Sequence, residues 1–564
     1  MNKWLTKLQF IFNYGAKIQI KIKIIFQSIV KSEIVSNYIA HNKASFRKFD
    51  ETTKSIILCE LNDMHSSHIA YSYLSNTLAK KYSAKIIAYV PRPIRGVGRK
   101  IIFKFKVAFK LNEIAVYQSF GVAEFICARM LAENKKRSIE LREKIVEDIQ
   151  FLSNREKKFY LENLVINDVW VGDLFYDTYL MSYERPTIDF DDPQFVIFLE
   201  ESLGLYYFWE NYFNINDIKS VIVSHCVYNI AIPLRIAVSR DIPAFQATSA
   251  AIYRLGKANC FAYSDFHYYP RTFSKLPLEV RDAGKMEAKR RIERRFKGEV
   301  GVDMSYSTKS AFSLPSHDCL IQPSNRKKIL IATHCFFDSP HSYGNNIFPD
   351  IYEWLEFLGE MTLRTDYDWY IKTHPDYWTG TMKVIKEFLN KYPRIILLPS
   401  NASHHQIIAE GIDVALTVWG TIGFEYAALD MPVINCSLNN PHIAYGFNLH
   451  PSSVQEYENL LLDLDSLNLK IDKESVYEYY FMNKIYNSEN IIFDDWQATL
   501  REMGGHAEQF TPKVYSCWMK EWSKQRHLSI AQALNRFVAQ EDFRLDYQHF
   551  SSVSTATGIE GTTI

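Results

Sequence analysis

Apolar runs that end in polar loops alternate with amphipathic runs along much of the chain. One example is the stretch "KSIILCELNDMHSSHIAYSYLSNTLAKKYSAKIIAYV", in which an apolar run ends near Glu60, a polar loop spans residues 62–67, and a helical pattern leads into a second apolar run. This succession predicts a βαβ unit of a parallel sheet. The pattern returns in "SVIVSHCVYNIAIPLRIAVSRDIPAFQA", which again predicts a strand, a helix and a strand.

The second half of the chain repeats the alternation. Strands are predicted in "KKILIATHCFFDSPH", "DWYIKTHP" and "RIILLPS", ahead of the stretch "LTVWGTIGFEYAALDMPVINC". Two such sets predict an α/β protein with two doubly wound Rossmann-like domains facing a cleft. The predicted parts are a basic amphipathic segment at 1–45, a first domain at 46–270 with a helical insertion at about 124–160, a helical connector at 271–325, a second domain at 326–500, and C-terminal helices with a disordered tail at 501–564.

Composition narrows the class of protein. A chain of 564 residues with 47% hydrophobic residues is too long for one core and apolar enough for two domains. Its 65 basic and 64 acidic side chains nearly cancel, so no overall field favours nucleic acid. The 8 cysteines form no C-x-x-C pair, and no apolar run reaches the roughly 18 residues that span a bilayer, so we expect a cytoplasmic protein without a zinc ribbon.

The first residues form a local exception to this balance. The stretch "MNKWLTKLQFIFNYGAKIQIKIKIIFQSIVK" mixes lysines with aromatic and aliphatic residues and contains no acid before Glu33. A segment of this kind can lie on an anionic membrane, which would place residues 1–33 on the inner face of the plasma membrane. The alternative is an amphipathic helix packed on its own protein with solvated lysines.

The stretch that begins at Leu416 is a candidate nucleotide site. It predicts a buried strand, a tight turn at Gly420, a helix N-cap at Thr421 and a carboxylate one turn later at Glu425. Free N–H groups at a helix start attract phosphate, and a carboxylate inside the helix can accept hydrogen bonds from ribose hydroxyls. The alternative is a strand-turn-helix whose glutamate only favours the helix dipole.

The stretch "IKTHP" adds two further candidates. In an extended strand Lys372 and His374 point to the same side, and Pro375 keeps His374 extended at the carboxyl end of the strand, where parallel sheets bind ligands. The two side chains could neutralise a phosphate leaving group, with His374 donating a hydrogen bond or a proton. The alternative is a structural histidine.

Together, "KTHP" and the downstream "TVWGTIGFEYAALDMPVI" resemble the donor-binding half of GT-B-type glycosyltransferases of the bacterial capsule and surface-carbohydrate group. That group includes the Kdo transferases of capsule assembly and, more distantly, sialyltransferases with an HP motif. The resemblance covers about Lys327 to Leu449. It implies that His374 contacts the nucleotide phosphate and that Thr421 and Glu425 bind phosphate and ribose.

The resemblance also implies an activity. The chain would move a sugar, such as the CMP-activated acidic sugar Kdo, from a nucleotide donor to a growing capsular or other surface polysaccharide. Its partners would be the nucleotide-sugar donor and a glycan or lipid-linked acceptor, with no cofactor and no obligatory metal. Three alternatives remain open: a teichoic-acid-type glycerophosphotransferase, a nucleotide-sugar 2-epimerase and a non-catalytic polysaccharide assembly subunit.

The catalytic base is less well marked, because the first half lacks the Asp/Glu-Asp/Glu-Gly motif of the HP-motif sialyltransferases. By position, Glu60, Asp63 and His65 end the first strand and His225 ends a later one. We predict Asp63 as the base, although its position also suits a helix cap.

Further histidines follow the strands of the second domain. His334 ends a strand and is predicted to touch the donor, whereas Asp338 and His341 beside it lack the spacing of a metal site, so no metal is expected. His404 and His405 are predicted to be surface residues.

Removing the residues before Ser32 tests the membrane prediction. If the lysines from Lys3 to Lys31 each contribute up to about 1 kcal/mol near an anionic surface, the shortened protein should sediment less with anionic liposomes and keep its activity. Sedimentation that is insensitive both to this truncation and to raised salt would reject the prediction.

Overall fold

The structure is a computed structural model that describes most of the chain. Two predicted features, the amphipathic leader before Ser32 and the disordered tail after Phe550, lie outside the described residues. The described residues are 32–46, 52–91, 97–111, 113–129, 132–304, 307–312, 318–377 and 380–550.

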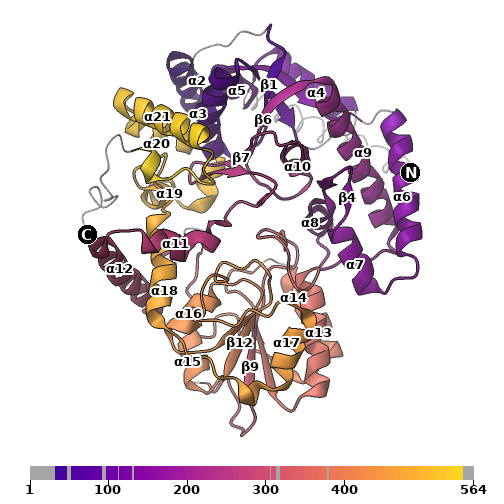
Figure 1. Ribbon diagram of the computed structural model, residues 1–564, viewed down its shortest axis with the longest axis vertical. Helices are drawn as coiled ribbons and strands as arrows, with labels where there is room; N and C mark the ends of the chain where they lie inside the picture. The colour runs from indigo at the N-terminus through magenta and orange to yellow at the C-terminus, as the bar shows by residue number, and fades with distance from the viewer. Residues whose placement is uncertain are drawn as a thin grey trace, which may run out of the picture.

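The first domain is built on a six-stranded sheet with the strand order β3-β2-β1-β6-β7-β8 (Figure 1). Neighbouring strands pair in parallel except β7 and β8, which are antiparallel. Side chains alternate across β1, so Ile56 and Leu58 enter one hydrophobic cluster while Ile57 and Cys59 enter another on the opposite face. The strands are β1 (Ser55–Glu60), β2 (Lys85–Val90), β3 (Val122–Cys127), β6 (Asp217–Val223), β7 (Ala244–Ala247) and β8 (Ile252–Leu255); β4 (Val165–Ile166) and β5 (Val169–Trp170) form a separate hairpin.

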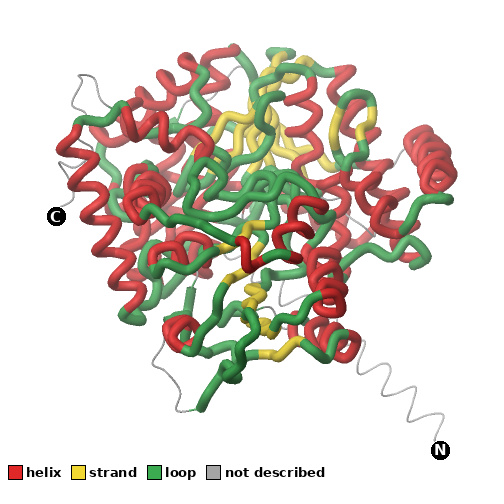
Figure 2. The backbone as a smooth tube through the Cα atoms, turned by 60° about the horizontal axis from the view of Figure 1, so that its bottom comes forward, coloured by secondary structure: helices red, strands yellow, loops and turns green. Residues whose placement is uncertain are grey.

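The second domain is built on a five-stranded sheet with the order β11-β10-β9-β12-β13, in which all pairs are parallel. Ile329 and Ile331 face one cluster and Leu330 faces another, so this sheet is also covered on both sides. Figure 2 shows the two groups of strands surrounded by helices. The prediction of an α/β protein with two doubly wound sheets is confirmed. The strands are β9 (Lys328–Ala332), β10 (Asp368–Lys372), β11 (Ile395–Leu397), β12 (Val414–Thr417) and β13 (Val433–Asn435).

Helices fill the connections of both domains. The helical segment of the first domain begins after β3, because residues 122–127, which overlap the predicted insertion, form that edge strand. The helices up to the connector are α2 (Glu33–Ser45), α3 (His65–Tyr82), α4 (Val97–Ala108), α5 (Glu113–Ser119), α6 (Ala132–Ile149), α7 (Asn154–Glu162), α8 (Gly172–Tyr183), α9 (Pro193–Ile215), α10 (Ile232–Ser239), α11 (Tyr269–Ser274) and α12 (Leu278–Phe296). Those that follow are α13 (Ile351–Arg364), α14 (Thr381–Lys391), α15 (His404–Ala409), α16 (Ile422–Ala428), α17 (Val454–Leu462), α18 (Lys473–Tyr480), α19 (Trp496–Met503), α20 (Lys513–Glu521) and α21 (Lys524–Gln540).

The C-terminal helices return to the first domain. Trp518 of α20 and Leu534 of α21 belong to the same buried cluster as Ile57 of β1, and the ring of Tyr515 stacks on Tyr38 of α2 at 4.0 Å between centroids. Figure 1 shows α20 and α21 beside α3 in the upper domain. Residues from the two ends of the chain therefore share one core.

The loops at the carboxyl ends of the two sheets meet. Tyr228, which follows β6, donates its hydroxyl hydrogen bond to Asp338, which follows β9. At one side of this junction Lys158 of α7 forms an ion pair of 2.5 Å with Glu353 of α13. In the part of the chain that the structure describes, no helix is long and apolar enough to cross a bilayer.

Replacing Trp518 by alanine tests the shared core. Trp518 is 1% exposed, so we expect Trp518→Ala to lower the free energy of unfolding by about 3–5 kcal/mol, as in other large cavities. Denaturant unfolding measures the change. Phe510→Ala is the control, because Phe510 is 43% exposed. Equal losses in the two variants would contradict a core role for α20.

Candidate functional site

The predicted donor residues lie around the carboxyl ends of β9, β10 and β12. Lys372 is the last residue of β10, His334 follows β9, and Gly420 follows β12. Because β9 is paired with both β10 and β12, these three strand ends are neighbours in the sheet. Ligands of parallel α/β sheets bind at this edge.

Lys372 places a buried cation at this edge. Its side chain is 3% exposed, and Nζ lies 3.4 Å from the carbonyl oxygen of Thr373. Among the described residues, no carboxylate oxygen lies within 4.0 Å of Nζ. Burial lowers the pKa of Lys372 to about 8, and the charge of Glu425 acts in the opposite direction. Lys372 is thus a cation, and the carboxylate of Glu425 that balances its charge is not in contact with it.

Glu425 is paired with a second, partly buried cation. Its carboxylate is 4% exposed and forms an ion pair through Oε1 with Arg295 at the end of α12. Arg295 also donates a hydrogen bond of 3.0 Å to the carbonyl oxygen of Val302. Sequence reasoning missed Arg295, although the basic run "KRRIERR" in the connector was a signal for an anion partner. With Lys372, the group carries two positive charges and one negative charge.

His374 is exposed and has a defined tautomer. The backbone N–H of Asp376 donates a hydrogen bond of 3.0 Å to Nδ1 of His374, so in the neutral ring the proton is on Nε2. Although the side chain is exposed at the surface, loss of water around the ring lowers the pKa of His374, and the Lys372 ammonium acts in the same direction. Near neutral pH the residue is therefore a neutral N–H donor beside Lys372.

His334 braces the turn that contains Gly420. Its Nε2 lies 2.9 Å from the hydroxyl oxygen of Thr417 and accepts a hydrogen bond of 3.3 Å from the Val418 N–H. Burial lowers the pKa of His334 to about 3, so the ring is neutral. A side chain at Gly420 would place Cβ 2.8 Å from the Thr417 hydroxyl and 3.0 Å from the His334 ring. Close approach of these groups, not a tight turn with positive φ, explains the glycine.

Thr421 stands at the N-cap of α16 as predicted, although its side chain makes no capping hydrogen bond. The expectation for His404 was wrong, because it is not a surface residue: it is 7% exposed, and its Nδ1 lies 2.7 Å from the hydroxyl of Tyr426. Burial lowers the pKa of His404 well below its ordinary value, and the positive charge of Lys372 adds to this effect. His404 is thus an uncharged side chain close to Lys372.

The predicted base candidates of the first domain have different surroundings. Glu60 is 2% exposed, and its carboxylate accepts hydrogen bonds of 2.6 Å and 2.7 Å from the backbone N–H and hydroxyl of Ser224. It therefore joins the ends of β1 and β6 in the interior of the domain. Asp63 is exposed, and its carbonyl oxygen lies 2.9 Å from Nδ1 of His65.

His225 is the base candidate that meets the second domain. Burial lowers its pKa, while the negative charge of Asp338 acts in the opposite direction. Asp338 is exposed and also accepts the hydrogen bond from Tyr228, whose backbone has φ of 61° and ψ of 171°. A non-glycine residue in this region is strained and needs support from its surroundings. Sequence reasoning considered Asp338 only as a metal ligand and rejected that role, so this junction was missed.

The three residues that could be mistaken for a metal cluster have separate partners. His341 is 1% exposed, and its Nδ1 lies 2.5 Å from Asp177 of α8, while its Nε2 lies 3.4 Å from Glu162 of α7. Burial acts to lower the pKa of His341, but the two carboxylates outweigh it and raise the pKa well above its ordinary value. His334 therefore supports the turn at Gly420, and Asp338 accepts a hydrogen bond at the junction between the domains. His341 takes part in an interdomain ion pair.

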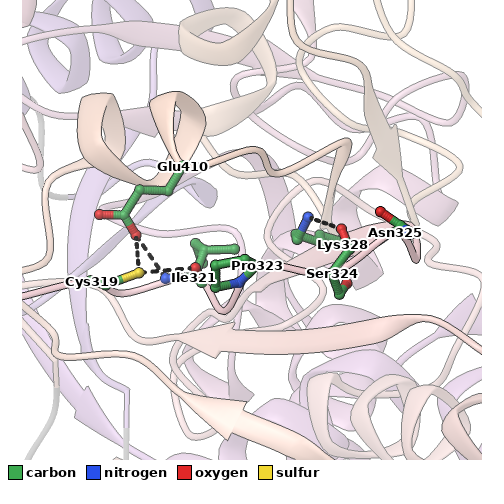
Figure 3. Close-up of a pocket in the computed structure, with 7 residues that line it drawn as sticks. All are labelled: Cys319, Ile321, Pro323, Ser324, Asn325, Lys328 and Glu410. Carbon is green, nitrogen blue, oxygen red and sulfur yellow. Dashed lines mark hydrogen bonds between the residues drawn. The ribbon is translucent and has the colours of Figure 1, made fainter.

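A surface pocket of about 700 Å³ lies at the opposite edge of the second sheet (Figure 3). Lys328 is the first residue of β9 there, and Glu410 follows α15. The Glu410 carboxylate accepts hydrogen bonds of 2.7 Å from the backbone N–H groups of Leu320 and Ile321, which ties the connector to α15. This pocket is remote from the carboxyl strand ends, so it is not part of the candidate donor site. We assign it to the packing of the connector against the second domain, because Glu410 binds the connector backbone there.

Comparisons with known proteins give distant structural relatives. No family model matches the chain, and no curated protein matches its sequence significantly. Among solved structures, the chain is similar to Thermosulfurimonas dismutans KpsC, a beta Kdo 2,4 transferase, with 12% identity, a TM-score of 0.30, and coverage of 47% of this chain and 79% of that chain.

Two further neighbours are matched over more of the chain. A UDP-GlcNAc 2-epimerase from Neisseria meningitidis has 11% identity and a TM-score of 0.22, over 77% of this chain and 99% of that chain. A glycosyltransferase from Rickettsia africae has 10% identity and a TM-score of 0.22, over 85% of this chain and 100% of that chain. Scores this low assign no family, so the function has to be inferred from the residues of the chain itself.

Proposed function

We propose that the protein is a glycosyltransferase that moves a sugar from a nucleotide donor, bound at the carboxyl ends of β9, β10 and β12, to a surface glycan. The observation that carries this proposal is the buried Lys372 ammonium, which has no carboxylate in contact among the described residues. A buried cation is stable only with an opposite charge nearby, and a phosphate of the donor would supply it.

The chemistry follows from the groups around this phosphate. The acceptor hydroxyl loses its proton to a base, its oxygen forms a bond to the anomeric carbon of the donor sugar, and the bond from that carbon to the phosphate oxygen breaks with its electron pair on the phosphate. Lys372 and the Nε2–H of His374 stabilise the resulting negative charge. Glu425, oriented by Arg295, would accept hydrogen bonds from the ribose through its remaining oxygen.

We favour His225 over Asp63 as the base. His225 lies in the junction beside Asp338 of the second domain, and burial keeps its imidazole neutral and able to accept a proton. For the donor, the surplus of one positive charge near Lys372 fits a CMP-activated acidic sugar such as Kdo, with a single phosphate. The proposed acceptor is a growing capsular or other surface polysaccharide.

Nucleotide binding and product analysis test the activity. The pure protein is heated with CMP, UDP, GDP and CDP-glycerol in turn, and the unfolding temperature is followed; a shift with CMP or another nucleotide is expected. Activated sugars are then supplied with and without a glycan acceptor. Sugar transfer supports the proposal, conversion of the donor without an acceptor indicates an epimerase, and turnover of CDP-glycerol indicates a glycerophosphotransferase. The absence of any nucleotide shift would reject the donor site.

Lys372 predicts a pH dependence of nucleotide binding. The charged form binds phosphate, so affinity should be steady below pH 8 and should fall by up to tenfold per pH unit above it, where the free lysine loses its proton. Lys372→Met should weaken binding by about 1.5–3 kcal/mol and abolish this decline. Titrations across the pH range measure both effects, and an unchanged decline in the variant would assign the pH dependence to another group.

His374 predicts a kinetic effect without a loss of stability. His374→Ala should lower turnover roughly a hundredfold or more, the range typical for loss of an electrostatic donor or acid, while the free energy of unfolding changes little because the ring is exposed. Turnover and denaturant unfolding are measured on the same preparation. A variant that unfolds easily but is fully active when folded would make His374 structural.

Glu425 and Arg295 can be separated by paired variants. Glu425→Gln and Arg295→Met both break the buried ion pair, so both should lower the free energy of unfolding by a few kcal/mol. Only Glu425→Gln removes the carboxylate proposed to meet the ribose, so it should weaken nucleotide binding about tenfold more than Arg295→Met does. Equal weakening would restrict Glu425 to a structural role.

A further inference from the structure

Helix α4 and the turn that follows it carry an apolar stripe that no other described part of the chain covers. Ile101, Phe105 and Phe109 are 60%, 42% and 61% exposed. They are spaced four residues apart, and the Phe109 N–H donates a hydrogen bond of 2.9 Å to the Phe105 carbonyl, so all three lie on one side of the helix. The rings of Phe105 and Phe109 are in contact, with 4.2 Å between their centroids.

Basic side chains flank this stripe. Residues of an α-helix are turned by about 100° each, which places Lys104 on one side of the stripe and Arg99 on the other, while Lys110 follows the end of the helix. All three are exposed. From Pro91 to Asn112 the sequence contains seven basic residues and no acidic residue. The helix therefore combines a continuous apolar stripe with a positive border.

The described core does not include this stripe. Strands β2 and β3 are adjacent and parallel, so a helix has to cover the sheet between them. That role belongs to α5, whose Ala115, Val116 and Tyr117 enter the buried cluster, whereas no described residue of α4 enters any of the hydrophobic clusters. In Figure 1, α4 lies in the upper domain, away from the second domain. The stripe is thus an addition to the βαβ connection.

We propose that α4 is a docking surface for an anionic lipid bilayer. An interfacial helix buries large apolar side chains at the boundary between headgroups and acyl chains, and its flanking lysines and arginines meet anionic headgroups. Nucleic acid would use the positive charges but not three adjacent large apolar side chains. This surface is separate from the sequence before Ser32 and does not depend on the proposed glycosyl transfer.

The full-length protein and vesicles provide the test. The protein should sediment with vesicles of equal parts phosphatidylglycerol and phosphatidylcholine, and much less with pure phosphatidylcholine. Phe105→Ser with Phe109→Ser should lower partitioning by roughly tenfold per side chain. Lys104→Glu with Lys110→Glu should lower it by at least about fivefold per lost positive charge, with the loss reduced at high salt.

Two controls and one local measurement make the result specific. Phe151 is 92% exposed on a loop, and the Lys383 side chain is 80% exposed on the second domain, so Phe151→Ser and Lys383→Glu should leave partitioning unchanged. Hydrogen exchange of the backbone amides from Arg99 to Lys110 should slow when anionic vesicles are added. The nucleotide thermal shift should be the same in all four variants, so a failure of the proposed function would be seen separately.

Three outcomes would overturn the proposal. The first is equal partitioning of the α4 variants and the controls, and the second is vesicle binding without slower exchange in α4, which would assign binding to another segment. The third is retention on DNA that is lost in the lysine variant but not in the phenylalanine variant, with no vesicle binding, which would assign the surface to nucleic acid.

Discussion

A buried ammonium at the end of β10 is the constraint around which the second domain is arranged. Lys372 is 3% exposed, and the nearest compensating charge is Glu425 on α16, which Arg295 on α12 already holds. Removal of one partner from such a buried group costs about 3–5 kcal/mol, so the strand, the helix and the connector are kept in one arrangement. The surplus positive charge that results is what an anionic ligand would neutralise.

The junction between the domains is held by the same kind of interaction. His341 carries a positive charge between Asp177 and Glu162, because their carboxylates raise its pKa, and Asp350 accepts hydrogen bonds from Tyr176 and Thr187 of the first domain. These buried polar contacts have geometric requirements that apolar contacts lack. They fix the position of the β6 loop opposite the β9 loop, which in turn supports the strained backbone of Tyr228.

The sequence was informative wherever a local pattern determines the outcome. Apolar runs of strand length predicted both parallel sheets, and the run that ends before Pro375 predicted the place of Lys372 at the carboxyl end of a strand. It was not informative where distant residues decide. Arg295 and Glu425 are 130 residues apart, and the need for glycine at position 420 comes in part from His334, which belongs to a different strand end.

Apolar faces show the same limit in another form. Trp518 and Phe105 both lie in amphipathic helices with lysines nearby, yet Trp518 is 1% exposed and Phe105 is 42% exposed. The spacing of apolar residues predicts that a helix has an apolar face. The order of the strands and helices determines whether that apolar face can pack on a sheet. The face of the first sheet that α5 covers is also occupied by α3, α20 and α21, which come from both ends of the chain. No described residue of α4 enters that cluster, so its apolar stripe stays outside the described core.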